Sequence, residues 1–130
     1  MKFKYLLLSC VSVLMLALPA RAGKLIFWSF EPNQNQVFFT TDAGVQPKAL
    51  LMSNPTRLII DLPGINLGRP TVKSSFNGTI RSLRVGQFNQ TTTRLVVEVS
   101  PGYTLNPQNV KVRGETPIHW FIQLPAPQKI

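Results

Sequence analysis

A nine-residue segment of this chain occurs twice. The segment PTRLIIDLP, Pro55 to Pro63, matches PIHWFIQLP, Pro117 to Pro125, at an offset of 62 along the chain, with both prolines, an isoleucine and a leucine in register. Toward the N-terminus, VFFTTDAG (37–44) aligns with LVVEVSPG (95–102) at an offset of 58. A unit of about 60 residues is longer than a solenoid repeat and suits two copies of one small β unit. The repeat therefore predicts a two-part scaffold whose copies can be compared position by position.

The offset of 58 also extends into the first strand of each copy. It aligns three apolar pairs: Leu25 with Leu83, Phe27 with Val85 and Phe30 with Phe88. Alternate residues of a strand point to the same side of a sheet. With this alignment, Trp28, Phe38 and Ile59 are expected to share the outward face of the first copy.

Residues 1–22 have the pattern of a secretory signal peptide. A basic start is followed by an apolar run, Tyr5 to Leu18, and by the sequence Pro-Ala-Arg-Ala ending at Ala22. The run is shorter than the ~20 residues that a spanning helix needs, so we expect no membrane span after cleavage. A lipoprotein signal ending at Cys10 would leave almost no apolar segment before the cysteine. We expect an exported protein of the periplasm or cell envelope.

The charge of the remaining segment, 23–130, restricts its partners. Three of the 14 basic residues precede it, which leaves 11 basic against 5 acidic residues and a net charge of +6. A basic exported domain favours acidic partners, such as wall polymers, anionic lipid headgroups or nucleic acid, and export argues against nucleic acid. The only cysteine, Cys10, lies in the predicted signal peptide, so no disulfide is expected.

Residues 23–125 are expected to form an all-β domain, because prolines and glycines separate short segments rich in β-branched and aromatic residues. Four strands precede and four follow a basic connector, 64–75, so the repeat halves are 24–64 and 80–125. The predicted fold is two small symmetry-related β-sheets packed as a sandwich, from an internal duplication. Residues 126–130 are interpreted as a tail or the start of a linker. The eight expected strands are 24–30, 36–41, 49–52, 57–62, 80–88, 94–99, 109–112 and 119–124.

Two of the expected strands each carry an arginine and a carboxylate four residues apart. These are Arg57 with Asp61 in one strand and Arg94 with Glu98 in the other. They can form a solvated surface with ion pairs that contribute under ~1 kcal/mol each. Alternatively, the arginines bind the carboxylates of a ligand through bidentate hydrogen bonds. The outward face of the second half is expected to display polar residues, namely Arg84, Arg94, Glu98, His119 and Gln123.

The aromatic residues allow two interpretations as well. Trp28 and Phe38 can form an exposed platform that stacks on sugar rings, or they can be buried against another part of the structure.

No catalytic, metal or cofactor site is expected. His119 is the only histidine and residues 23–130 contain no cysteine, whereas zinc sites need three or four such ligands. No nucleophile-elbow pattern accompanies the histidine, and no glycine-rich phosphate loop is present. The five acidic residues are scattered among strands and turns rather than paired at a cleft.

Two segments together resemble the AMIN domain: SNPTRLIIDLPG, Ser53 to Gly64, and IRSLRVGQFNQTTTRLVVEVSPG, Ile80 to Gly102. This domain is found at the N-terminus of bacterial N-acetylmuramoyl-L-alanine amidases and in type IV pilus secretins, and the resemblance covers nearly all of 23–130. It implies two symmetry-related sheets and a non-catalytic domain that binds peptidoglycan, in amidases at the division septum. By position, the motif residues are Arg57 in the first copy and Arg84, Gly86, Gln87 and Arg94 in the second.

The resemblance implies a peptidoglycan-binding module that targets or retains a protein in the envelope. Arg84 and Arg94 would pair with stem-peptide carboxylates, Gln87 would bond to sugars, and Arg57 completes the expected ligand-binding set. Nothing here matches the zinc domain of the amidases, so the chain is either a stand-alone module or part of a longer protein, and no enzyme is expected. The alternative is a protein-interaction or assembly module of an envelope complex, such as a pilus secretin, that docks through an apolar contact around Trp28 and Phe38.

Overall fold

The central strands of the structure show a regular alternation of buried and partly exposed side chains. In β2 (Gln36–Thr41) and β8 (Thr92–Val99), every second residue is buried and the residues between are partly exposed. This pattern suits a strand with one face on a core and one face toward solvent. The computed structural model describes residues 22–130. The predicted signal peptide therefore lies, except for its last residue, outside the described residues.

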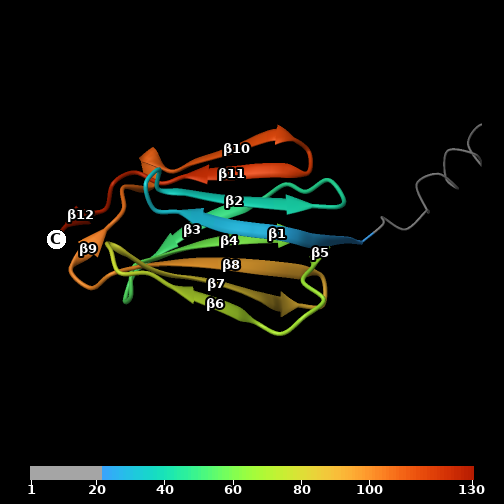
Figure 1. Ribbon diagram of the computed structural model, residues 1–130, viewed down its shortest axis with the longest axis horizontal. Helices are drawn as coiled ribbons and strands as arrows, with labels where there is room; N and C mark the ends of the chain where they lie inside the picture. The colour runs from blue at the N-terminus through green and yellow to red at the C-terminus, as the bar shows by residue number, and fades with distance from the viewer. Residues whose placement is uncertain (1–21) are drawn as a thin grey trace, which may run out of the picture.

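Two five-stranded sheets pack face to face as a sandwich (Figure 1), which confirms the predicted fold class. All neighbouring strands are antiparallel except β1 and β5, which are parallel. Sheet I consists, in spatial order, of β10 (Lys111–Thr116), β11 (His119–Gln123), β2, β1 (Gly23–Glu31) and β5 (Ile65–Asn66). Sheet II consists of β3 (Lys48–Met52), β4 (Arg57–Pro63), β8, β7 (Ile80–Asn89) and β6 (Val72–Ser75).

All eight expected strands are present, and the structure adds four short ones. Two of these, β5 and β6, lie in the segment that we expected to be only a connector. The other two, β9 (Tyr103–Thr104) and β12 (Gln128–Lys129), pair with each other. The strand expected to start at 109 begins instead at Lys111, because a short 3₁₀ turn, η1 (Pro107–Asn109), precedes it.

Each sheet contains one hairpin from each predicted copy. Sheet I joins β1 and β2 of the first half to β10 and β11 of the second, and sheet II joins β3 and β4 to β7 and β8. The order β10-β11-β2-β1 in one sheet is therefore equivalent to β3-β4-β8-β7 in the other. The two halves are interlocked, so neither half forms a sheet by itself.

The strand register follows the two offsets found in the sequence. Between β4 and β8, Asp61 lies opposite Arg94. The equivalent pair between β11 and β2 is Gln123 opposite Gln36. The offset of 62 relates Asp61 to Gln123, and the offset of 58 relates Gln36 to Arg94. The two central strand pairs of the sheets are thus related by the symmetry that the repeat predicts.

The alignment of the first strands is wrong by three positions. Leu25 lies opposite Thr41 and precedes a bulge, and Ile80 occupies the same position opposite Val99, so Leu25 corresponds to Ile80 and not to Leu83. The β7–β8 hairpin extends further than the β1–β2 hairpin, which shifts the first strand against the second. Because three is an odd number, the shift also exchanges the two faces of β1.

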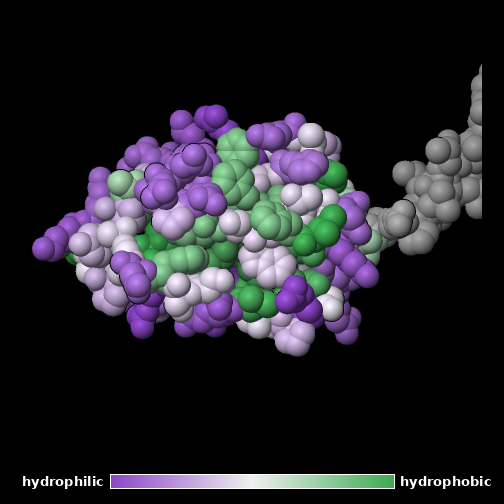
Figure 2. Space-filling model, viewed as in Figure 1, coloured by the Kyte–Doolittle hydropathy of each residue, from purple (hydrophilic) through white to green (hydrophobic). Residues whose placement is uncertain are grey.

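The core lies between the sheets. Figure 2 shows apolar residues across the middle of the visible face, in the region of β1, with hydrophilic residues along its upper and left margins. Two buried hydroxyls are satisfied: Thr93 Oγ1 donates to the Ile65 carbonyl at 2.7 Å and Thr41 Oγ1 to the Ala43 carbonyl at 2.6 Å. The largest fully buried side chains include Val37, Phe39, Leu58, Ile60, Leu62, Leu95, Val97 and Ile122.

Candidate functional site: the outer face of sheet II

A cleft of about 420 Å³ lies on the outer face of sheet II, the face of β3, β4, β8 and β7 that points away from the core. The register places outward-pointing residues of these four strands side by side. All four residues expected to bind a ligand line this cleft. Its lining includes Arg57, Arg84, Gln87 and Arg94, together with Ile59, Phe88 and Val96.

The cleft has an apolar floor. Ile59 points outward from the central strand β4, between Leu50 of β3 and Val96 of β8, yet it is only 6% exposed. Leu50 beside it is 61% exposed, and Met52 on the same strand is exposed as well. The outer face of sheet II therefore combines arginines with aliphatic surface, a mixture that the charge pattern of the sequence did not reveal.

Arg94 is held rigidly. Its Nε donates to Asp61 Oδ1 at 2.7 Å and its Nη2 to Asp61 Oδ2 at 3.0 Å. Its guanidinium carbon lies 3.5 Å from the centre of the Phe88 ring. The hydrogen bond to Asp61 raises the pKa of Arg94, against a smaller opposing effect of burial. Arg94 is thus permanently charged, oriented on two sides and largely neutralised by its own carboxylate partner.

Arg57 is oriented by the turn between β3 and β4. Its Nη1 donates to the Pro55 carbonyl at 2.9 Å and to the Ser53 carbonyl at 3.2 Å. Glu98 lies opposite Arg57 in register but pairs with Arg81, at 3.5 Å between Nε and Oε2. Among the described residues, Arg57 therefore makes no ion pair, and its charge is available at one side of the cleft.

Arg84 and Lys73 lie directly opposite each other on β7 and β6, and both are exposed. Neither takes part in an ion pair within residues 22–130. Like charges at opposed positions of neighbouring strands destabilise a sheet. A bound anion would relieve that repulsion, so this pair is a candidate anion-binding position on the outer face of sheet II. Lys73 was not among the predicted site residues, because it was assigned to the connector rather than to a strand.

Gln87 fixes the end of the β7–β8 hairpin. Its Oε1 accepts from the Leu67 amide at 2.7 Å, and its Nε2 donates to the Asn89 carbonyl at 2.8 Å and the Thr92 carbonyl at 3.2 Å. A further contact joins Nε2 to Asn66 Oδ1 at 3.3 Å. The polar atoms of this side chain are engaged within the chain, which ties β7 to the connector.

The expected apolar contact around Trp28 and Phe38 is not one surface. Trp28 lies opposite Phe39 on the inner side of β1, partly buried against the core, with the Arg69 guanidinium 5.5 Å from its ring centre. Phe38 lies on the outer face of sheet I, with its ring centre 6.1 Å from that of Phe121. The expectation that Trp28 shares a face with Phe38 and Ile59 is wrong, because the alignment of β1 is shifted and because Ile59 belongs to sheet II.

The polar face expected for the second half is also divided. Arg84, Arg94 and Glu98 lie on sheet II, whereas His119 and Gln123 lie on sheet I. Their strands were assigned to one half in sequence, but the exchange of hairpins separates them.

A family model described as the AMIN domain matches residues 24–124. The chain belongs to the AMIN domain family. This confirms the resemblance seen in the two motif segments, and those segments supply most of the residues that line the cleft on sheet II. AMIN domains are non-catalytic modules that generally bind peptidoglycan and localise proteins, and they occur in periplasmic and envelope proteins. A comparison with curated proteins gives no match.

Two further observations concern this AMIN domain within the part of the chain that the structure describes. No cluster of three or more histidine, cysteine or carboxylate side chains is placed to hold a metal ion. Over the same residues, 22–130, no helix has the length and apolar character needed to span a membrane.

Proposed function

We propose that this AMIN domain binds peptidoglycan through the outer face of sheet II and so retains its protein in the periplasm or cell envelope. The opposed cations Arg84 and Lys73 are the observation that supports this function, together with the apolar floor at Ile59 in the cleft that Arg84 lines. Stem peptides present carboxylates together with small aliphatic side chains, and this face offers a partner for both. The rigid Arg94 and the turn-bound Arg57 border the same cleft and add hydrogen-bond donors in fixed positions.

Sedimentation with purified sacculi tests the proposal. Residues 23–130 should pellet with sacculi at low salt and be released as the salt concentration rises. The reason is that exposed ionic contacts are screened: the Debye length falls from about 10 Å at 0.1 M salt to about 3 Å at 1 M. Protein that stays wholly in the supernatant at low salt would refute wall binding. Binding that persists undiminished at 1 M salt would mean that the cations are not its source.

Asp61→Asn should strengthen sacculus binding while it weakens the fold. The substitution removes the carboxylate that neutralises Arg94, so the cleft gains a full positive charge and affinity rises roughly two- to fivefold. The lost bidentate interaction is partly exposed to solvent, so its loss should cost only about 1 kcal/mol of unfolding free energy. Sedimentation and urea denaturation measure the two effects. Glu31→Gln, which removes one negative charge from the exposed end of β1, is the matched control and should change neither quantity by much.

The outer face of sheet I favours a second candidate function, docking of an envelope protein. Phe27 is 56% exposed, and the tilted Phe38–Phe121 pair lies on the same outer side. An assembly module of the kind expected for a secretin would use such a face. Co-purification of an envelope protein without wall material, lost on Phe38→Ser but retained on Arg84→Glu, would support this function over wall binding.

A further inference from the structure

The two ends of the sandwich are closed differently. After Pro125, the chain forms β12, which pairs with β9: Gln128 lies opposite Thr104 and Lys129 opposite Tyr103. At the offset of 58, the counterpart of β9 in the first copy is Val45-Gln46. That segment belongs to no strand, because the residues after Pro63 form β5 and pair with β1 instead. In the second copy, β12 therefore covers the edge of β9. In the first copy, no strand of residues 22–130 covers the equivalent edge at Val45-Gln46.

The backbone of the open segment lacks the ladder that its counterpart has. Val45 donates to the Pro117 carbonyl at 3.3 Å, but no backbone hydrogen bond of Gln46 is present within residues 22–130. Val45 is buried between the exposed residues Gly44 and Gln46, which fits the alternation of a strand. The segment thus has the form of a strand edge at which, within residues 22–130, the backbone of Gln46 has no partner.

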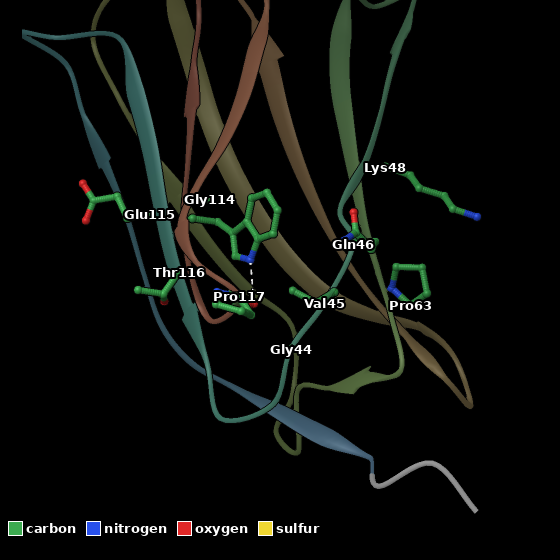
Figure 3. A pocket seen from close by; sticks show the side chains of 10 residues that line it. Gly44, Val45, Gln46, Lys48, Pro63, Gly114, Glu115, Thr116 and Pro117 are labelled. Atoms are coloured by element: carbon green, nitrogen blue, oxygen red, sulfur yellow. Dashed lines mark hydrogen bonds between the residues drawn. The ribbon is translucent and has the colours of Figure 1, made fainter. Parts of the chain in front are cut away.

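A cleft of about 750 Å³ lies beside this edge, within the usual size range of ligand sites. Figure 3 shows Val45, Gln46, Pro63 and Pro117 around it, whereas the charged groups of Glu115 and Lys48 point away on opposite sides. The other eight residues that line it are uncharged and include two prolines, Pro63 and Pro117. This distinguishes the cleft from the cationic outer face of sheet II.

Trp120 supplies a fixed aromatic wall. Its Nε1 donates to the Pro117 carbonyl at 2.9 Å. A Cβ atom on Gly114 would lie 2.9–3.0 Å from three atoms of the indole, so the absence of a side chain there is what lets the ring occupy this place. The residue equivalent to Gly114 on β3 is Leu51, which packs on the core opposite Leu58. At this position the first copy therefore has an aliphatic side chain, Leu51, whereas the second copy has a glycine with the Trp120 indole packed against it, beside the cleft.

We propose that this cleft binds an extended, proline-containing peptide segment of a partner protein, which adds a strand to Val45-Gln46 as β12 does to β9. Backbone hydrogen bonds to the free edge would give affinity, and a proline or small apolar side chain would pack on Trp120. The kind of occupant is inferred from the counterpart: in the second copy, the chain's own Gln128-Lys129, which follows Ala126-Pro127, pairs with β9. The proposal uses a surface other than that of wall binding and does not depend on it.

The heptapeptide LPAPQKI, which reproduces residues 124–130, serves as the probe. Residues 23–130 carrying Trp28→Phe have Trp120 as the single tryptophan reporter. Titration with the peptide should change its fluorescence in a saturable way. The same peptide with an N-methyl group on its glutamine should bind about five- to tenfold more weakly, because one backbone donor of the ladder is blocked.

Two pairs of protein variants locate the contact. Gln46→Pro removes the free backbone N–H and should weaken peptide binding about five- to tenfold, whereas Gln46→Ala keeps it and should leave binding unchanged. Gly114→Ala displaces the indole and should weaken binding, whereas Gly78→Ala, where a Cβ meets nothing within 4 Å, should not. Thermal melts verify that each variant is folded. Sacculus sedimentation should be the same for Gln46→Pro and the unmodified domain, so that this proposal and wall binding fail or succeed separately.

Three results would overturn the proposal. These are the absence of any saturable fluorescence change up to millimolar peptide, equal binding of the N-methylated peptide, and unchanged binding by Gln46→Pro. An oligomer of N-acetylglucosamine is added in a parallel titration. A saturable response to the sugar but not to the peptide would make the cleft a saccharide site and would also overturn it.

Discussion

Arg84→Glu should remove most of the binding to sacculi, by about ten- to a hundredfold in affinity. The substitution deletes a charge-assisted contact worth about 1.5–3 kcal/mol and places a negative charge where the ligand's carboxylate is expected. The fold should survive, because Arg84 is exposed and the new glutamate lies opposite Lys73, where it replaces a repulsion with an attraction. Sedimentation with sacculi at low salt measures the loss, and urea denaturation verifies that stability is equal or higher.

Arg113→Glu is the matched control for this experiment. It makes the same change in net charge on an exposed position of β10 in sheet I, remote from the outer face of sheet II. If binding depends on the local site, the control should retain most of its affinity. Equal losses for both variants would show that wall binding responds to overall charge alone and would contradict the assignment of the site to sheet II.

Ile60→Ala should destabilise the domain by about 2–5 kcal/mol and lower its melting temperature by roughly 10–20 °C. Ile60 has 0% of its surface exposed and lies in β4, between β3 and β8, with its side chain in the core of the sandwich. Its removal leaves a cavity that the flanking strands are unable to close. Urea unfolding followed by circular dichroism measures the loss of unfolding free energy.

Ile59→Ala is the natural comparison, since it makes the same substitution at the adjacent position. Ile59 is almost as buried, but it lies under the side chains of the outer face, where water can enter the space that a smaller residue leaves. Its cost in stability should be clearly smaller, and it should weaken sacculus binding because it removes the floor of the cleft. Equal losses of stability would mean that the outer face of sheet II is a second packed core rather than a binding surface.

Much of the fold followed from the sequence, because its signals are local or repeated. Alternation along β2 and β8 and the turn residues between segments located the eight main strands. The two repeat offsets agree with the equivalent register of Asp61–Arg94 and Gln123–Gln36, although no strand pairing was predicted, and the motif segments brought Arg57, Arg84 and Arg94 into one hypothesis.

Other features depended on pairings between distant strands. The β7–β8 hairpin is longer than its counterpart, so the alignment of β1 failed and Trp28 faces the core. The connector supplies β6, which places Lys73 opposite Arg84. The free edge at Val45-Gln46 exists only because β5 pairs with β1 rather than with that segment.

From the amino-acid sequence alone, it was clear which residues alternate, approximately where the eight main strands lie, and that the two halves share one plan. Which face of each strand is inside, and which strands share a sheet, depended on contacts between distant parts of the chain. The physical reason is that a strand has no preferred face of its own: its alternation defines two sides, and a partner strand far away in the sequence selects the side that is buried. The exchange of hairpins between the halves made that selection here, and with it placed the cationic cleft on sheet II and left one end of the sandwich open.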